Sequence, residues 1–514
     1  METLSGNTNE PTTPNQTGPR EPTSTPASQD AIPGRSELTT IHHQQSLQLG
    51  ALNDPNCQSC EKSCPDERAK ANGNGNENGK MEEEKVGVLE KVKGVLKLAS
   101  EASQASLGSD WKDEDIVYPD GGLRAWMVVI GGTLVTFSTF GFANSWGVFQ
   151  AYYETTMLPT TSPSAIAWIG SMQYSLVYIP GVFAGRLCDL GYFKVPFITG
   201  ASIAVLAIFL IAESTKYWQL LVTQGIMLGL GAGICDGALF PVVAHWWYKR
   251  RGLVFGLAAV GASAGGAVYP IAARELIPLV GFPWTMRIMG FFSAFALGSA
   301  SILVSRRLPP KKMPGGIFNL AVFKNKTFSV YCGSTLVIFL GIYTVLTYID
   351  IGATRAGISP EFSFYLVSIA NASAAPTRVA IGLLADRFGA VNVIVPFTLS
   401  AAILTFAWPY ATTKGSLIAL AVLYGMCNSA FASVFNLPLY TLGDMGDVGR
   451  RVGIVMFFTS IGALVGPPIS GALYDKTGGM HAVSYYAGGA IILGCSMMLY
   501  AKYLFYGGTL KGKW

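Results

Sequence analysis

Long apolar segments alternate with short polar ones from Leu123 to the end of the chain. A helix needs about 20 mostly apolar residues to cross a bilayer. By this measure we place twelve spans, near residues 123–151, 165–185, 195–213, 217–244, 253–275, 285–305, 328–350, 362–385, 391–410, 416–441, 452–473 and 483–506. The longest interruption, 306–327, separates six spans from six. The pattern predicts an all-α membrane protein with two pseudo-symmetric six-helix halves, 121–305 and 328–514, joined by a cytoplasmic linker, 306–327.

The first 120 residues have a different pattern, with runs of Pro, Ser, Thr, Asn and Gly and few large apolar side chains. Such a composition buries too little apolar surface to offset the entropy of folding, so we expect a disordered tail. Residues 81–104 are an exception, because apolar residues recur there at helical spacing and favour an amphipathic helix. Cys57, Cys60 and Cys64 have a spacing that can bind a metal, but three reduced thiols are the simpler interpretation in a cytosolic tail, so we predict no metal site.

Charge predicts the orientation of the spans. Up to Asp120 the chain has 11 Lys and Arg against 20 Asp and Glu, and from Gly121 onward it has 25 against 11. The basic residues gather in the loops after the even-numbered spans, and basic loops are retained in the cytoplasm. Both termini are therefore expected to be cytoplasmic, in the plasma membrane or alternatively the vacuolar membrane. The sequence lacks a basic patch with interleaved aromatic residues, so nucleic-acid binding is not implied.

A short polar motif occurs after span two and again after span eight. The first copy contains Gly185, Asp189, Gly191 and Lys194, and the second contains Gly382, Asp386, Arg387 and Gly389. Glycine permits close helix approach, and an aspartate with a nearby cation can hold a helix terminus. We interpret the two copies as latches on the cytoplasmic face.

These motifs resemble the signature loop of the major facilitator superfamily, although the first copy is one residue shorter between its aspartate and final glycine. Asp120-Gly121-Gly122 before Trp126 resembles the start of its monocarboxylate porter branch, as in fungal members. The resemblance covers roughly Tyr118 to the C-terminus. It implies a twelve-helix transporter with a solute site between the halves.

Arg378 is the main candidate for contacting the solute, because a charge inside a span is costly and is usually functional. It stands four residues before Gly382, and the resemblance implies that an arginine at this position contacts a substrate carboxylate. Two charges typical of the branch are replaced by Ala374 and Asn144. Asp236 in span four is a candidate to pair with Arg378 or to accept a coupled proton. Further candidates to line a cavity, or simply to bond between helices, are Asn144, Gln173, Asn371, Tyr343 and Asn428.

The sequence therefore predicts a secondary transporter in the lipid bilayer. We expect its solute to be a small organic anion, because Arg378 is the candidate to contact it. A G-x-S-x-G match at Gly261 lies inside span five and does not indicate an enzyme. With no nucleotide-binding motif, energy comes from a gradient, and no cofactor is implied. Export of a metabolite is favoured; proton-coupled uptake of a monocarboxylate or vitamin and a non-transporting nutrient sensor are the alternatives.

Overall fold

The computed structural model of the chain describes residues 112–113, 116–311, 316 and 320–514. All regular secondary structure in these residues is helical, as the apolar pattern predicts. The tail up to residue 111 lies outside the described residues, together with the predicted helix at 81–104 and the cluster of Cys57, Cys60 and Cys64. Part of the linker 306–327 lies outside them as well. The proposed domain boundaries remain predictions.

The helices follow one another along the chain as antiparallel membrane crossings. Span one contains α3 (Leu123–Ser138), α4 (Phe140–Ala143) and α5 (Trp146–Tyr152); span two contains α6 (Pro163–Leu176) and α7 (Gly181–Asp189); then follow α8 (Lys194–Ala212), α9 (Tyr217–Leu220) with α10 (Gly229–Ala244), α11 (Arg251–Leu303), α12 (Lys326–Phe339) with α13 (Thr344–Arg355), α14 (Pro360–Ser363) with α15 (Tyr365–Phe388), α16 (Ala390–Ala407), α17 (Lys414–Val434), α18 (Val448–Thr477) and α19 (Met480–Phe505). Several helices begin at a side-chain cap, such as Asn325 before α12, whose side chain accepts from two backbone N–H groups.

Twelve crossings result from these helices. Ten helical stretches in the described part are long and apolar enough to cross a membrane. One of them, α11, has 53 residues and is two crossings, since Gly281 interrupts it with a φ of 78°. The stretch of α6 and α7 adds another crossing that is less apolar.

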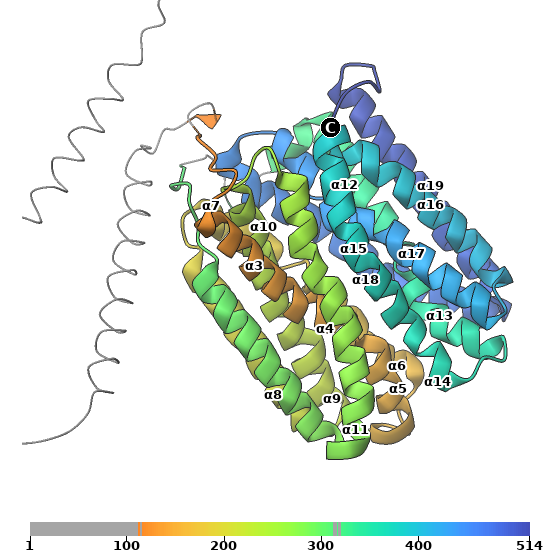
Figure 1. Ribbon diagram of the computed structural model, residues 1–514. Coiled ribbons are helices and arrows are strands. Elements are labelled where there is room, and N and C mark those ends of the chain that lie inside the picture. The colour runs from red at the N-terminus through yellow and green to blue at the C-terminus, as the bar shows by residue number, and fades with distance from the viewer. Residues whose placement is uncertain (1–111, 114–115, 312–315, 317–319) are drawn as a thin grey trace, which may run out of the picture. The chain divides into compact units, whose positions relative to one another are not determined.

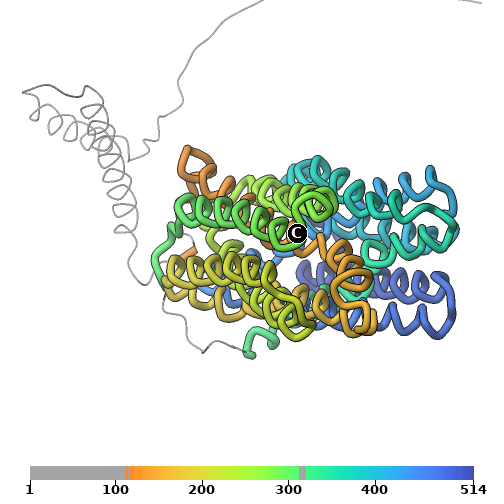
Figure 2. The backbone as a smooth tube through the Cα atoms, turned by 90° about the horizontal axis from the view of Figure 1, so that it is seen from below, coloured from red at the N-terminus to blue at the C-terminus, as the bar shows by residue number. Residues whose placement is uncertain are grey.

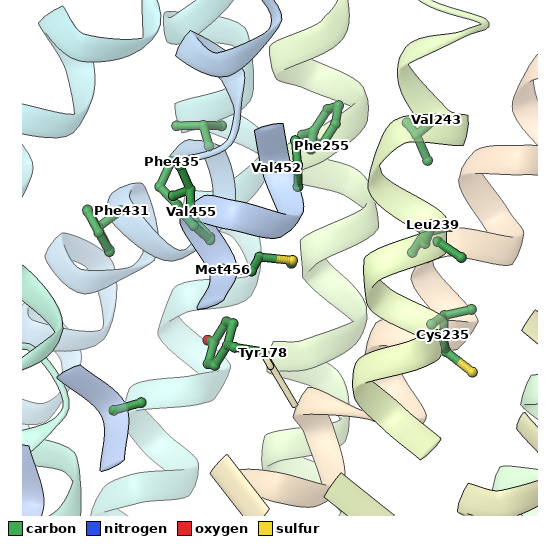
Figure 3. Packing of buried hydrophobic residues seen from close by; sticks show 14 of the residues in the cluster. Tyr178, Cys235, Leu239, Val243, Phe255, Phe431, Phe435, Val452, Val455 and Met456 are labelled. Atoms are coloured by element: carbon green, nitrogen blue, oxygen red, sulfur yellow. The ribbon is translucent and has the colours of Figure 1, made fainter. Parts of the chain in front are cut away.

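The helices of the first half, α3 to α11, and those of the second, α12 to α19, form two neighbouring groups (Figure 1). Seen along the bundle, the orange-to-green helices lie beside the teal-to-blue ones (Figure 2). Buried apolar side chains of both halves join one cluster, which includes Tyr178, Phe255, Val452 and Met456 (Figure 3). The apolar core therefore continues across the boundary between the halves.

Three spans are broken near their middle. Span one is interrupted at Asn144 and Ser145, span two between α6 and α7 at residues 177–180, and span seven between α12 and α13 at residues 340–343. The break in span two ends at Pro180, which has no N–H to donate. Irregular backbone at membrane depth is tolerated where protein buries it or where it lines a cavity. The breaks therefore direct attention to the space between spans one, two and seven.

Candidate functional site

The first polar motif joins the end of span two to the start of span eleven. The Asp189 carboxylate accepts hydrogen bonds from the backbone N–H groups of Gly449 (2.9 Å) and Arg450 (2.8 Å), in the first turn of α18. These N–H groups have no partner within their own helix, and the helix dipole favours a negative charge there. A Cβ atom on Gly185 would overlap the Gly449 carbonyl group. The first motif thus connects the two halves.

The second motif repeats this arrangement with the halves exchanged. The Asp386 carboxylate accepts from the N–H groups of Gly252 (2.6 Å) and Leu253 (2.9 Å) at the start of α11. Gly382 lies so close to Gly252 that an added Cβ would overlap its carbonyl group. Each half therefore holds the first turn of a helix in the other half. We call the end of the bundle that carries both motifs the hinge face.

The other residues predicted for the two motifs make local contacts. Gly191 and Gly389 turn the chain with φ values of 103° and 97°, which favour glycine. Lys194 donates to the Ser301 carbonyl oxygen (2.6 Å) in its own half. The Arg387 guanidinium lies 5.3 Å from the ring centroid of its neighbour Phe388. Neither cation bridges the halves through these contacts.

Further contacts close the hinge face, most of them near Asp189. Arg186 of α7 lies 3.8 Å from Asp447, and Arg450 lies 2.6 Å from the same carboxylate. The Arg306 guanidinium donates to the backbone oxygen of Asp189 (3.3 Å), and burial lowers the pKa of Arg306, which lies outside the spans. Tyr440 of the second half donates to the Phe240 carbonyl oxygen (3.0 Å). Charged and polar groups of both halves therefore close this end.

A cavity of about 190 Å³ opens between the halves toward the opposite end. Residues near the ends of the spans farthest from the hinge face, such as Glu154 and Asp350, help to line it. The lining residues come from spans one, two, five, seven, eight and eleven: Asn144, Ser145, Trp146, Gly147, Val148, Gln150, Ala151, Glu154, Tyr174, Pro270, Phe339, Tyr343, Leu346, Thr347, Asp350, Ile351, Phe364, Val367, Asn371, Ala463 and Pro467. The protein is thus closed at one face and hollowed at the other.

Arg378 lies deeper than the cavity. It is 7% exposed, and its Nε has no hydrogen-bond partner. Its electrostatic neighbours are the phenols of Tyr343 and Tyr178. Among the described residues no carboxylate lies within ion-pair distance of Arg378. Within the described part of the chain, Arg378 is therefore a buried positive charge without a negative partner.

Three of the polar residues proposed from sequence line the cavity, namely Asn144, Asn371 and Tyr343. The Asn144 side-chain oxygen accepts a hydrogen bond from the Tyr174 hydroxyl (2.9 Å). Asn371 donates to the Val367 carbonyl oxygen (3.1 Å) one turn earlier in its own helix. The cavity thus brings together amide and phenol groups from spans one, two, seven and eight.

Asp236, Gln173 and Asn428 are not among the cavity-lining residues. Asp236 is fully buried and accepts a hydrogen bond from Thr139 (3.2 Å) in its own half, while its other oxygen has no partner. In this conformation Asp236 does not pair with Arg378, one of the two roles that the sequence suggested. Gln173 and Asn428 are also buried, each with an amide oxygen that has no partner.

Of the aromatic residues beside Arg378, only Tyr343 was singled out from the sequence. Tyr174 and Tyr178 lie four residues apart in span two, and Phe339 and Tyr343 lie four apart in span seven. The rings meet across the halves, with centroids 6.1 Å apart for Tyr174 and Tyr343 and 5.3 Å for Tyr178 and Phe339. The spacing of four was visible in the sequence, but it does not reveal that span two faces span seven.

The relationship to known proteins agrees with this architecture. The model of the Major Facilitator Superfamily matches residues 132–445. The chain belongs to the major facilitator superfamily. It is accordingly a multi-pass membrane transporter of a small organic solute and not an enzyme.

Fungal members of the superfamily resemble the chain over most of its length. A major facilitator transporter of Aspergillus flavus is 33% identical over 386 residues, which cover 74% of this chain and 87% of that protein. The aspyridones efflux protein of Emericella nidulans is 32% identical over 420 residues, or 79% of this chain and 86% of that protein.

Solved structures of the superfamily share the fold at low sequence identity. The human organic anion transporter TETRAN is 14% identical with a TM-score of 0.60, and the match covers 74% of this chain and all of that one. The transporter FucP, in an outward conformation, is 16% identical with a TM-score of 0.58 and coverages of 73% and 98%. At this low sequence identity, the similarity to these structures shows a shared fold.

Proposed function

We propose that the protein exports an organic anion by alternating access and that Arg378 binds the anionic group. One observation carries this proposal: Arg378 is buried near the cavity, and no carboxylate of the described residues lies beside it. Taking an ion out of water costs several kcal/mol unless a partner compensates the charge. A carboxylate on the solute would supply that partner, and the planar guanidinium can hold it through two hydrogen bonds.

The conformation fits one step of an export cycle. Basic loops orient the hinge face toward the cytoplasm, so the cavity would open to the outside. Release of solute would occur in this conformation. Separation of both motifs from the starts of α11 and α18 would open the hinge face and admit the next solute. The two aspartates therefore act as latches that favour the conformation described above.

Similarity to the aspyridones efflux protein supports export over uptake. We place the chain in the monocarboxylate porter-like branch, on the motif before Trp126 and the position of Arg378, and in the plasma membrane with both termini in the cytoplasm. Asp236 is the proposed site of a coupled proton, because one of its buried oxygens has no partner. Uptake driven by the same proton is the alternative direction.

Transport by cells that express the full chain tests the proposal. Efflux of preloaded organic acids is measured with and without a pH gradient, for the natural protein and for Arg378→Ala. We expect the substitution to reduce flux by about tenfold or more, because an ion pair with a buried partner is lost. Arg287→Ala is the matched control, since Arg287 pairs with the exposed Glu213 (2.5 Å) away from the cavity.

Each part of the proposal has its own contrary outcome. Normal flux in Arg378→Ala would refute the anion site, and flux that ignores the pH gradient would refute coupling through Asp236. No flux of any acid in either direction would favour a sensor over a transporter.

A further inference from the structure

Four aromatic rings form a continuous set between the halves at the floor of the cavity. We call Tyr174, Tyr178, Phe339 and Tyr343 the aromatic ladder. Besides the two pairs that meet across the halves, the rings of Phe339 and Tyr343 lie with centroids 5.4 Å apart. Each half therefore contributes two rings, and the contacts between them join the four into one surface.

The aromatic ladder lies between the cavity and Arg378. Tyr174, Phe339 and Tyr343 line the cavity, whereas Arg378 does not. The electrostatic neighbours of Arg378 are Tyr343 and Tyr178. A solute whose anionic end reaches Arg378 from the cavity must therefore place the rest of its body against these rings.

The remaining cavity wall provides no second positive charge. None of the residues that line the cavity is Lys, Arg or His, and Glu154 and Asp350 carry negative charge. Ring faces also have negative potential, so they disfavour a carboxylate and favour a flat apolar group that stacks on them. The site thus has a single positive group, Arg378, and an extended aromatic surface for the uncharged body.

Two residues of the aromatic ladder lie where their spans are interrupted. Tyr178 lies between α6 and α7, and Tyr343 lies between α12 and α13. The backbone there keeps shorter bonds, such as Tyr178 N–H to the Ser175 oxygen and Gly341 N–H to the Ile338 oxygen, in place of the regular helical pattern. Both rings therefore lie at bends of their spans, where a change in the bend would move them apart.

We infer that the transported class is aryl carboxylates: the carboxylate binds Arg378 and the planar ring system inserts into the aromatic ladder. This inference rests on the proposed function and names the solute class for the same site. Tyr174 and Tyr343 are then the residues that determine specificity, because they contact the solute body from opposite halves.

A pair of probes with equal charge and carbon skeleton tests the inference. KM for transport by the full chain is measured with 2-naphthoate and with its saturated counterpart, decahydronaphthalene-2-carboxylate. We expect a lower KM for the aromatic acid by several-fold, up to about tenfold, which is the range of aromatic stacking. Tyr343→Leu and Tyr174→Leu should lose this preference, and Tyr343→Phe should keep it.

The outcomes distinguish this inference from the function on which it rests. Equal KM values for the two acids in the natural protein, with both requiring Arg378, would overturn the solute class alone. A preference that survives in both Leu variants would overturn the role of the aromatic ladder. Transport of neither acid, or of both acids unchanged in Arg378→Ala, would overturn the class and the anion site together.

Discussion

The two halves meet along two seams that begin alike at the hinge face and differ at the other end. The first seam joins span two to span eleven, and the second joins α11 to α15. At the hinge face each seam has a buried glycine contact and an aspartate that holds a helix start. Beyond the middle of the bundle only the second seam remains closed.

The first seam ends at the level of Ser175, whose hydroxyl donates to the Ser460 carbonyl oxygen (3.4 Å). Farther from the hinge face, no hydrogen bond or ion pair joins spans two and eleven in the described part of the chain. Instead Tyr174 on one side and Ala463 and Pro467 on the other line the cavity.

The second seam continues to the far end of the bundle. Gly256 packs against the backbone of Arg378, and Gly266 packs against Asn371. Arg274 then donates to the Glu361 carbonyl oxygen (2.8 Å) and lies over the ring of Phe364 (4.8 Å). The far face is therefore open along the first seam only. The second seam stays closed and forms the back wall of the cavity.

The largest expected effect comes from filling the glycine contacts at the hinge face. In Gly185→Val and Gly382→Val the new side chain would overlap the backbone of the opposite half. Overpacking costs roughly 1–3 kcal/mol, and here it can be relieved by separating the halves. We expect solute flux per surface-expressed molecule to fall by about tenfold or more in each variant, because the hinge face cannot close.

Gly298→Val is the matched control for this pair, since a Cβ at Gly298 meets nothing within 4 Å. A cysteine in place of Met456, which is fully buried beside Gly181, reports opening of the hinge face in inside-out membrane vesicles, through its reaction with a membrane-impermeant thiol reagent. Normal flux together with an unreactive cysteine in both valine variants would show that the close contacts do not control closure.

Removing the charge of each latch should have a smaller effect that differs between the seams. Asp189→Asn and Asp386→Asn leave the backbone N–H groups with a neutral acceptor in place of a charged one. Hydrogen bonds to charged groups contribute about 1.5–3 kcal/mol, so we expect a loss of flux of about tenfold for Asp189 and less for Asp386. Asp189 is 3% exposed and lies beside the Arg186, Asp447 and Arg450 cluster, whereas Asp386 is only half-buried.

The same flux assay and the Met456→Cys reporter measure both latch variants, with surface expression as the control for folding. An equal loss in the two variants would mean that the charged cluster adds nothing to the first latch. Unchanged flux in both would remove the latch interpretation.

The sequence predicted the features that depend on length and local pattern. Apolar runs determine the spans because the bilayer fixes how much apolar helix is needed. The repeated motif around Gly185 and Gly382 identified both contacts at the hinge face, and counting back from Gly382 identified Arg378. The spans are confirmed because they depend on residues close together in the chain, whereas the roles of the motif residues and of Arg378 stay predictions.

Features that depend on packing between distant segments were not predictable in this way. The break at residues 340–343 lies in a continuous apolar run, and Gly341 within it lies close to the backbone of Ala487 in α19. The partner of Asp236 is Thr139 in its own half, although Arg378 has the opposite charge. The pairing of Tyr178 with Phe339 likewise requires knowing which spans face each other.

The smallest expected effect concerns the far end of the second seam. Arg274→Ala removes the hydrogen bond to the Glu361 backbone and the contacts with the Phe364 and Tyr365 rings. Because this end is solvent-exposed, we expect flux to change by only about two- to threefold. The matched control is Arg355→Ala, since the Arg355 guanidinium lies over the Tyr474 ring (5.1 Å) within the second half.

If the back wall opens during transport, Arg274→Ala should also increase thiol labelling of a cysteine placed at Val367, which lines the cavity beside this seam. Unchanged labelling and flux would mean that the second seam is held closed by its glycine contacts alone, and the difference between the seams would then lie in the packing around Gly256 and Gly266.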